Sequence, residues 1–271
     1  MKVSHALAGA GIEPREARLL LAEACGFSEA SVIAQGGREL PPEIEARFND
    51  FVARRRAGEP IAYIVGRREF WSLDLTVNPD VLIPRPETEL LVELALQRIP
   101  QNAQVDIADL GTGSGAIALA IACERPRARV LATDASTAAL AVARDNATRL
   151  GIGNVGFAQG DWCAAVGGQR FDLLVSNPPY IAQADIHLQQ GDLRFEPRAA
   201  LASGIDGLDA IRSIVAAAPG HLHPHGWLLF EHGHDQGSSA RDLLAQSGFV
   251  ETFTAVDLEQ RDRVSGGRAR A

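Results

Sequence analysis

The pattern of apolar and polar positions divides the chain into a helical first part and a longer part in which strands alternate with helices. Over residues 1–65 apolar residues recur with helical spacing. Pro14 opens one helix that Gly26 closes, and Pro42 opens another. The spacing predicts a bundle of four or five short helices. Patterning alone leaves open whether this bundle is a stabilising cap or a domain that docks a substrate.

Between residues 66 and 80 the pattern changes to partial alternation with aromatic residues, which predicts a β-hairpin linking the two parts. The prolines that follow Val81 forbid a central strand, and Pro86 begins the next helix. The segment from Leu82 to Thr88 is therefore either a plain linker or a rigid arm that folds over a ligand. The expected organisation is a helical domain over 1–65, a hairpin over 66–80 and an α/β domain over 81–271.

Within the α/β domain, short apolar runs alternate with helical patterns. Strands are predicted near 105–110, 129–133, 153–158, 171–175, 226–231 and 249–256, and helices near 115–124, 136–150, 207–218 and 237–247. A last strand near 262–268 is expected as an antiparallel edge strand. This order of elements predicts a doubly wound, Rossmann-like sheet.

Composition and charge narrow the class of protein. The chain has 271 residues, of which 46% are hydrophobic and 22% charged, as in a globular protein that can bury a core. Its net charge of -8 argues against a protein that grips long nucleic acid through phosphates. The cysteines show no C-x-x-C spacing, charged residues come too early for a signal peptide, and no apolar run reaches membrane-spanning length. We expect a cytoplasmic protein with no membrane and no direct nucleic-acid partner.

A glycine-rich loop follows the first strand of the predicted sheet and opens a helix. Its sequence is Asp109-Leu110-Gly111-Thr112-Gly113-Ser114-Gly115. Glycine suits such a loop because a side chain would keep the backbone away from a ligand. With Ala116 next, the loop also meets the dinucleotide pattern G-x-G-x-x-G/A, so the loop alone does not identify the cofactor.

Two further strand ends carry candidate cofactor contacts. Asp134 ends the second strand, where an acid can accept hydrogen bonds from both hydroxyls of a ribose. Asp161 and Trp162 follow the third strand. The indole of Trp162 either packs on an adenine ring or belongs to the core.

The strand near 171–175 ends in the turn Ser176-Asn177-Pro178-Pro179-Tyr180. Two prolines cannot continue a strand, so the chain leaves the sheet at the edge where open α/β sheets bind ligands. The side-chain oxygen of Asn177 and the carbonyl of Pro178 can accept both hydrogens of a planar NH2 group, on which Tyr180 can stack. Asparagine and proline are also common in ordinary turns. The glycine loop upstream favours the interpretation that this turn binds a planar NH2 group. No Tyr-Lys pair or histidine stands where hydride transfer would need it, which favours methyl transfer.

Taken together, the loop 109–115, Asp134 and the turn 177–180 resemble class I S-adenosylmethionine-dependent methyltransferases that modify planar amino groups. Further stretches narrow the resemblance to the release factor glutamine methyltransferase family (PrmC/HemK): Gly58 to Ile64, Leu82 to Glu89, Phe195 to Leu208 and Asp257 to Val264. It covers nearly the whole chain. Ser72 and Gln260 depart from the family, which often has glycine there, and they affect local turn geometry.

The resemblance implies an enzyme that methylates the side-chain amide nitrogen of the glutamine in the Gly-Gly-Gln motif of class I peptide chain release factors. Its cofactor would be S-adenosyl-L-methionine, with S-adenosyl-L-homocysteine as the product. Family contacts to the cofactor fall on Gly111 to Gly115, Asp134, Trp162 and Asn177, and the strand ends add Asp109 and Asp161. The substrate contacts fall on Asn177, Pro178, Pro179 and Tyr180, and the catalytic role on Asn177, Pro178 and Tyr180. The family places the helical domain 1–65 against the release factor, and we expect a monomer that needs no metal ion.

Other functions stay open at this point. A ribosomal-protein glutamine methyltransferase would share the fold and the chemistry, whereas a DNA methyltransferase would need a target-recognition insert that the chain lacks. A non-catalytic S-adenosylmethionine-binding interaction module is disfavoured by the intact turn at Asn177. His221, His223 and His225 alternate in a predicted loop, where solvated or hydrogen-bonded histidines are favoured over metal ligands.

Overall fold

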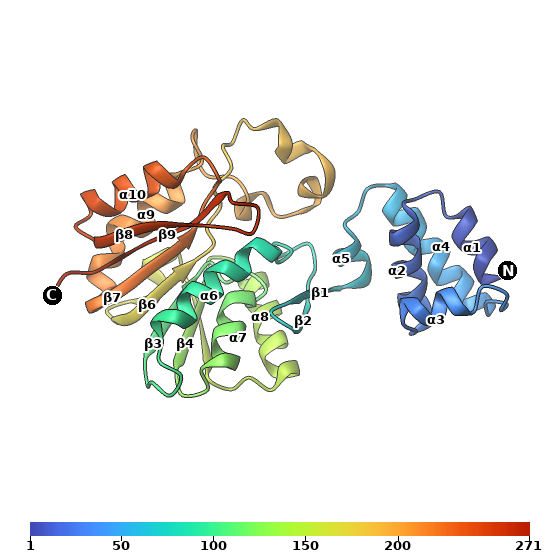
Figure 1. Cartoon of the computed structure of the whole chain (residues 1–271), viewed down its shortest axis with the longest axis horizontal. Helices are drawn as coiled ribbons and strands as arrows, with labels where there is room; N and C mark the ends of the chain where they lie inside the picture. Colours follow the sequence, from blue (N-terminus) through green and yellow to red (C-terminus); the bar gives the residue numbers. More distant parts are fainter. The chain divides into compact units, whose positions relative to one another are not determined.

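The computed structural model describes all 271 residues, which form two compact units, Met1–Arg67 and Arg68–Ala271 (Figure 1). The smaller unit contains the helices α1 (Val3–Gly9), α2 (Pro14–Cys25), α3 (Glu29–Ala34), α4 (Pro42–Arg56) and α5 (Ile61–Val65). Proline is tolerated at the start of α2 and α4 because the first turn of a helix leaves its N–H groups without helical partners. The helical bundle expected over residues 1–65 is confirmed, with the fully buried Leu20, Leu21 and Phe48 in its core.

The expected hairpin follows α5 as β1 (Arg67–Phe70) and β2 (Leu73–Thr76). Ser72 in its turn has a φ of 59°, and Gln260 before β9 has a φ of 60°. Both therefore adopt the left-handed conformation that glycine enters at least cost. This conformation explains why glycine suits these two positions, at which the sequence departs from the family. A 3-10 turn (η1, Pro86–Thr88) then leads into α6 (Glu89–Arg98).

The larger unit is built on a seven-stranded sheet with the strand order β5-β4-β3-β6-β7-β9-β8. Its strands are β3 (Asp106–Leu110), β4 (Arg129–Asp134), β5 (Val155–Gln159), β6 (Phe171–Ser176), β7 (Leu222–Glu231), β8 (Val250–Val256) and β9 (Asp262–Arg268). The strands β3 to β7 pair in parallel, and β9 pairs antiparallel with both β7 and β8. The doubly wound class is confirmed, but the prediction that strand 262–268 lies at the edge is wrong. After β8 the chain turns back and β9 pairs between β7 and β8, so the edge strands of the sheet are β5 and β8.

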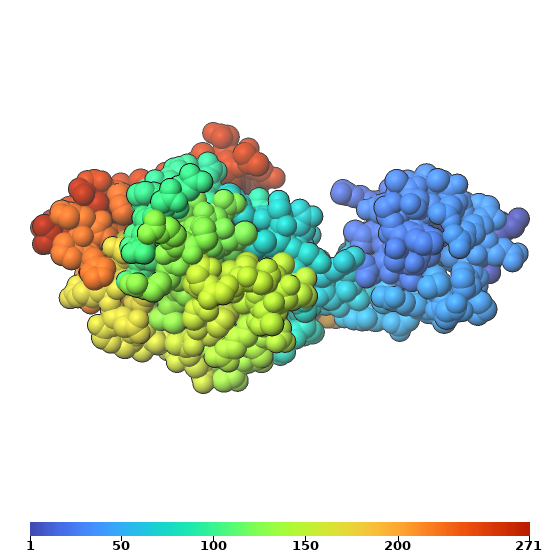
Figure 2. Space-filling model, turned by 90° about the horizontal axis from the view of Figure 1, so that it is seen from below, coloured from blue at the N-terminus to red at the C-terminus, as the bar shows by residue number.

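Helices cover both faces of this sheet, because successive side chains of each strand point to opposite faces. Ile107 and Val130 belong to the core under α6 and α7 (Ala116–Glu124), with Ala147 from α8 (Thr137–Leu150). Ala108 and Phe230 belong to the core under α9 (Asp209–Ala217) and α10 (Gly237–Gln246). Figure 1 shows the sheet between these layers, and Figure 2 shows the green and yellow-green atoms of the α7 and α8 region on the surface of the larger unit.

Two regions differ from the pattern-based expectation. The strand β7 starts at Leu222, so His223 and His225 lie within it and not in a loop, with a register irregularity opposite Phe171 to Leu173. Short 3-10 turns fill the segment between β6 and α9, at Ile186–Gln189, Gly191–Phe195 and Arg198–Ala200. None of the helices combines the length and the apolar character needed to cross a membrane.

Candidate functional site

A cavity of about 490 Å3 opens at the carboxyl ends of the parallel strands in the larger unit. The ends of four strands contribute to its wall: the glycine loop after β3, Asp134 at the end of β4, Asp161 and Trp162 after β5, and Asn177 and Pro179 after β6. Open α/β sheets bind ligands in this position because the chain crosses from one face to the other there. The structure thus brings together four separate stretches that the sequence marked.

The glycine loop requires glycine for its backbone conformation, and at Gly111 and Gly115 also because neighbouring side chains lie close. Gly111, Gly113 and Gly115 have φ values of 76°, 56° and 87°. A Cβ on Gly111 would lie 3.0 Å from the ring of Trp162, and one on Gly115 would lie 3.1 Å from Leu119. The backbone of the loop therefore forms part of the cavity wall, to which it contributes Gly111, Thr112, Gly113 and Ser114. Gly115 lies directly before α7.

Asp109 lies beneath this loop rather than in the cavity wall. Its side chain is fully buried and accepts hydrogen bonds from the Thr112 hydroxyl at 2.6 Å and from the Ala118 backbone N–H at 3.2 Å. Its other carboxyl oxygen, Oδ1, has no hydrogen-bond partner. Burial raises the pKa of Asp109 to about 7, whereas the two hydrogen bonds lower it. This carboxyl ties the glycine loop to the first turn of α7.

Asp134 and Trp162 both contribute to the cavity wall beside the glycine loop. The carboxylate of Asp134 accepts hydrogen bonds from the Gly113 N–H at 2.9 Å and from the Ser136 N–H at 2.8 Å. Each of its oxygens keeps a further lone pair for another donor. Trp162 is half-buried and packs against the core beneath, while its ring also lines the cavity. Trp162 thus belongs partly to the core, and the same ring is available in the cavity wall.

Asn177 is held through its amide nitrogen. Nδ2 donates to the hydroxyl of Thr88 at 3.1 Å, and this hydroxyl donates to Oε2 of Glu231 at 2.6 Å. The hydroxyl of Tyr180 donates to the other oxygen of Glu231 at 3.0 Å. Burial and the nearby Glu231 carboxylate both raise the pKa of Tyr180, so this side chain stays a neutral donor. Pro178 is buried, and neither Pro178 nor Tyr180 is among the residues that line the cavity.

The Leu82 to Thr88 segment lies over the cavity and contributes Leu82, Pro84, Arg85 and Thr88 to its wall. Glu196, whose side chain is fully buried, accepts from the Ile83 N–H at 3.0 Å and pairs with the Arg85 guanidinium. These contacts fix the segment to the loop before Pro197, which also lines the cavity. The segment, called the arm below, is thus held in the cavity wall by these contacts and is not a plain linker.

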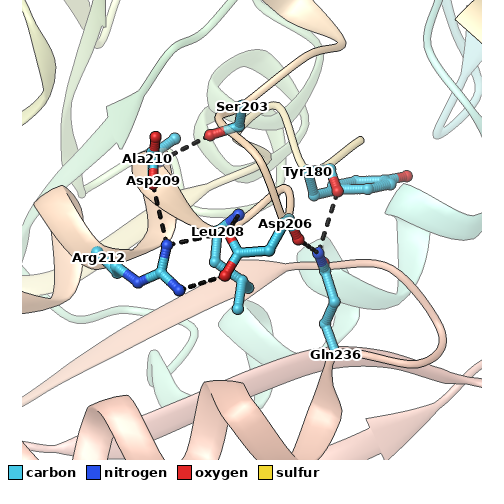
Figure 3. A network of polar contacts seen from close by, with 8 residues as sticks. All are labelled: Tyr180, Ser203, Asp206, Leu208, Asp209, Ala210, Arg212 and Gln236. Carbon is cyan, nitrogen blue, oxygen red and sulfur yellow. Dashed lines mark hydrogen bonds and ion pairs between the residues drawn. The ribbon is translucent and has the colours of Figure 1, made fainter. Parts of the chain in front are cut away.

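A second set of contacts holds the backbone of the turn at Tyr180 (Figure 3). The amide nitrogen of Gln236 donates to the Tyr180 carbonyl at 3.1 Å and to the Asp206 carbonyl at 3.2 Å. The Asp206 carboxylate is in turn paired with Arg212 at the start of α9. The turn after β6 is thus tied to the loops before α9 and α10.

The sequence analysis assigned no role to three side chains that hold the site together, Glu196, Glu231 and Gln236, and it left open whether the segment that ends at Thr88 contacts the ligand. Each contacts a partner far away along the chain; the Thr88–Glu231 bond joins residues 143 positions apart. The sequence could have indicated Thr88 and Glu196, because both fall inside stretches that carry the family resemblance. Glu231 and Gln236 lie beyond any such stretch, and only the fold brings them to the site.

Replacing Gly207 by alanine should destabilise the larger unit. Gly207 has a φ of 77°, and a Cβ there would lie 2.1 Å from the carbonyl oxygen of Tyr180 and 2.8 Å from Nε2 of Gln236. The backbone must move, which typically costs about 1 to 3 kcal/mol. Urea denaturation measures the free energy of unfolding; Gly168→Ala, which meets open space, is the control. Equal unfolding free energies for the two variants would contradict the close approach.

Comparisons with known proteins identify the family of the chain. The family model described as PrmC N-terminal domain matches residues 1–66, and the one described as Methyltransferase small domain matches residues 87–196. The release factor glutamine methyltransferase of Xylella fastidiosa is 54% identical, and the match covers 95% of this chain and 94% of the relative. That of Burkholderia pseudomallei is 51% identical, covering 95% and 92%.

A solved methyltransferase from Pyrococcus furiosus has the same fold. It is superposed with a TM-score of 0.56 at 18% identity, covering 81% of this chain and 98% of that one. Together with the match to the methyltransferase family model, this similarity shows a methyltransferase fold of class I, and the relatives confirm the resemblance drawn from the sequence motifs. With about half of its residues identical to those of such relatives over nearly its full length, the chain belongs to the release factor glutamine methyltransferase family.

Proposed function

We propose that this protein transfers the methyl group of S-adenosyl-L-methionine to the side-chain amide nitrogen of the glutamine in the Gly-Gly-Gln motif of class I peptide chain release factors. The observation that carries the proposal is the state of Asn177. One N–H of its side-chain amide donates to the Thr88 oxygen, so the amide oxygen points away from Thr88 and stays available as an acceptor, and Asn177 lines the cavity. An acceptor held in this way suits the N–H of a planar carboxamide.

The residues of the cavity fit S-adenosyl-L-methionine. The glycine loop carries no Cβ atoms at three positions, Asp134 keeps acceptor lone pairs for ribose hydroxyls, and the indole of Trp162 offers an aromatic surface for adenine. When bound, the cofactor supplies an electrophilic methyl group. The buried Asp109 fixes the loop from below, so its part is to position the loop and not to contact the cofactor.

The turn at Asn177 would act on the substrate mainly by orientation. An amide nitrogen is a weak nucleophile because its lone pair is delocalised over the carbonyl. The Asn177 oxygen and the Pro178 carbonyl can accept its two N–H bonds and fix the plane of the amide, with Pro179 and Tyr180 completing the turn. Correct alignment of two reacting groups can supply roughly 7 to 11 kcal/mol. Apolar side chains of the arm, such as Leu82 and Pro84, help to exclude water from the cavity.

The release factor as partner is supported by the names of the relatives, which are release factor glutamine methyltransferases. We assign the helical unit, residues 1–66 of the PrmC N-terminal match, to docking of this partner. We further propose a cytoplasmic monomer that has no direct nucleic-acid or membrane partner. A ribosomal protein remains the alternative substrate, since the same turn would serve its glutamine.

Incubation of the full chain with methyl-labelled S-adenosyl-L-methionine tests the proposal. A class I release factor, a ribosomal protein and DNA are offered in parallel, together with a release factor whose motif glutamine is replaced by glutamate. We expect label on the unaltered release factor alone, mapped by mass spectrometry to the glutamine of Gly-Gly-Gln. Label on the ribosomal protein only, or no label on any of the substrates, would contradict the proposal.

A further inference from the structure

We propose that Thr88 and Glu231 are positioning residues that set which end of the Asn177 amide faces the substrate. The inference rests on the proposed function and adds to it a cause for the orientation of Asn177. The oxygen and nitrogen ends of a carboxamide have nearly the same shape, so packing alone does not choose between them. Hydrogen-bond partners make the choice.

The direction of the hydrogen bonds starts from Glu231. Glu231 is the last residue of β7 and is 1% exposed. Each of its two carboxyl oxygens accepts a hydrogen bond from one hydroxyl, that of Thr88 at 2.6 Å and that of Tyr180 at 3.0 Å. A carboxylate only accepts hydrogen bonds. The single hydroxyl hydrogen of Thr88 is therefore committed to Glu231, and the Thr88 oxygen can only accept from its other neighbour.

That other neighbour is the amide of Asn177, 3.1 Å away. Only Nδ2 can donate to the Thr88 oxygen, so the amide nitrogen must face Thr88 and the oxygen must face the cavity. In the reversed orientation the two oxygens would repel, and an NH2 group would meet the NH2 group of the substrate. Each misplaced pair leaves a polar group without a suitable hydrogen-bond partner, which is unfavourable.

The three residues come from elements that only the fold brings together. Thr88 ends the arm over the cavity, Glu231 ends β7 and Asn177 follows β6. The arm therefore does more than cover the ligand: its last residue sets the acceptor on which the substrate amide would be aligned.

The ionised form of Glu231 is required for this orientation. Burial raises its pKa, and the nearby Glu87 carboxylate adds to this. The hydrogen bonds from Thr88 and Tyr180 and the Arg263 guanidinium lower its pKa. Arg263 is also paired with Asp257 at 3.2 Å. A protonated Glu231 would donate to Thr88 and remove the cause of the orientation.

Thr88→Val and Thr88→Ser test the inference, because valine keeps the shape of threonine without its hydroxyl and serine keeps the hydroxyl. We expect Thr88→Val to lower kcat for release factor methylation about tenfold, while the Kd of the cofactor, measured by calorimetry, changes less than about twofold. Thr88→Ser should recover most of kcat. Melting temperatures of both variants show that they are folded.

Glu231→Gln is the second variant, since glutamine keeps the size and presents one donor and one acceptor to the two hydroxyls. We expect kcat to fall about tenfold and the acid limb that Glu231 contributes to the pH profile of kcat to disappear. Failure of the wild-type chain to methylate the release factor would overturn the proposed function and this inference with it. A methylating wild type together with a Thr88→Val variant of wild-type kcat would overturn the inference alone.

Discussion

Asn177→Ala should reduce methylation of the release factor more than any other single replacement in the turn. Removing the side chain leaves a substrate N–H without its acceptor, at a cost of about 1 to 3 kcal/mol, or about a tenfold to a hundredfold loss of rate. Misplacement of the amide by about 1 Å can add a further hundredfold. The Thr88 oxygen also loses its donor in this variant. The measurement is single-turnover methylation with saturating cofactor.

The controls separate chemistry from binding and folding. Cofactor affinity, measured by calorimetry, should stay within a few-fold of the wild type, because the cavity wall around the glycine loop and Asp134 is unchanged. Asn102 is exposed, so Asn102→Ala serves as the matched replacement and should methylate normally. Turnover of Asn177→Ala within about twofold of the wild type would remove Asn177 from the mechanism.

The sequence predicted those parts of the structure that depend on local physical rules. Buried strands produce apolar runs, and the helices of the bundle show their period together with proline at the start and glycine at the end. The Asn177 turn and the glycine loop were predictable for the same reason, since proline and glycine restrict or free the backbone wherever they stand. These features placed the candidate cavity at the correct edge of the sheet.

Features that depend on contacts between distant segments were not predictable in this way. The residues of β9 have the pattern of any partly buried strand. Their sequence does not show that β9 pairs with β7 as well as with β8. The Thr88–Glu231 contact joins residues 143 positions apart, and Glu231 reads as the last residue of an apolar strand. Asp109 was expected at the ligand, but burial beneath the loop depends on how the loop packs on α7.

The burial of Asp109 has a consequence for stability that changes with pH. Burial raises its pKa from 3.8 to about 7, so between these values the folded state keeps a proton that the unfolded chain has released. A state that binds more protons loses stability relative to the other as pH rises. The free energy of unfolding should therefore fall through this window because of Asp109, and the loss should be complete above about pH 7. A pKa shift of this size corresponds to a decrease in the free energy of unfolding on the order of 4 kcal/mol.

Asp109→Asn should remove this dependence. The asparagine oxygen can accept from the Thr112 hydroxyl and the Ala118 N–H as the aspartate does, and its NH2 group takes the place of the oxygen that has no partner. Near pH 4 the protonated aspartic acid and the asparagine are nearly equivalent, so the two proteins should differ by less than about 1 kcal/mol. Above pH 7 the variant should be more stable, by up to about 4 kcal/mol.

Urea denaturation of both proteins from pH 4 to pH 8 measures this difference, because every other titrating group contributes equally to the two curves. Parallel curves across the range would show that Asp109 is ionised in the folded protein at little cost. If the two curves of unfolding free energy against pH diverge, Asp109 destabilises the folded protein at neutral pH. Natural proteins retain such groups where function needs them, and a carboxylate beneath the loop would favour a cationic ligand above it. The variant should then also bind S-adenosyl-L-methionine more weakly above pH 7.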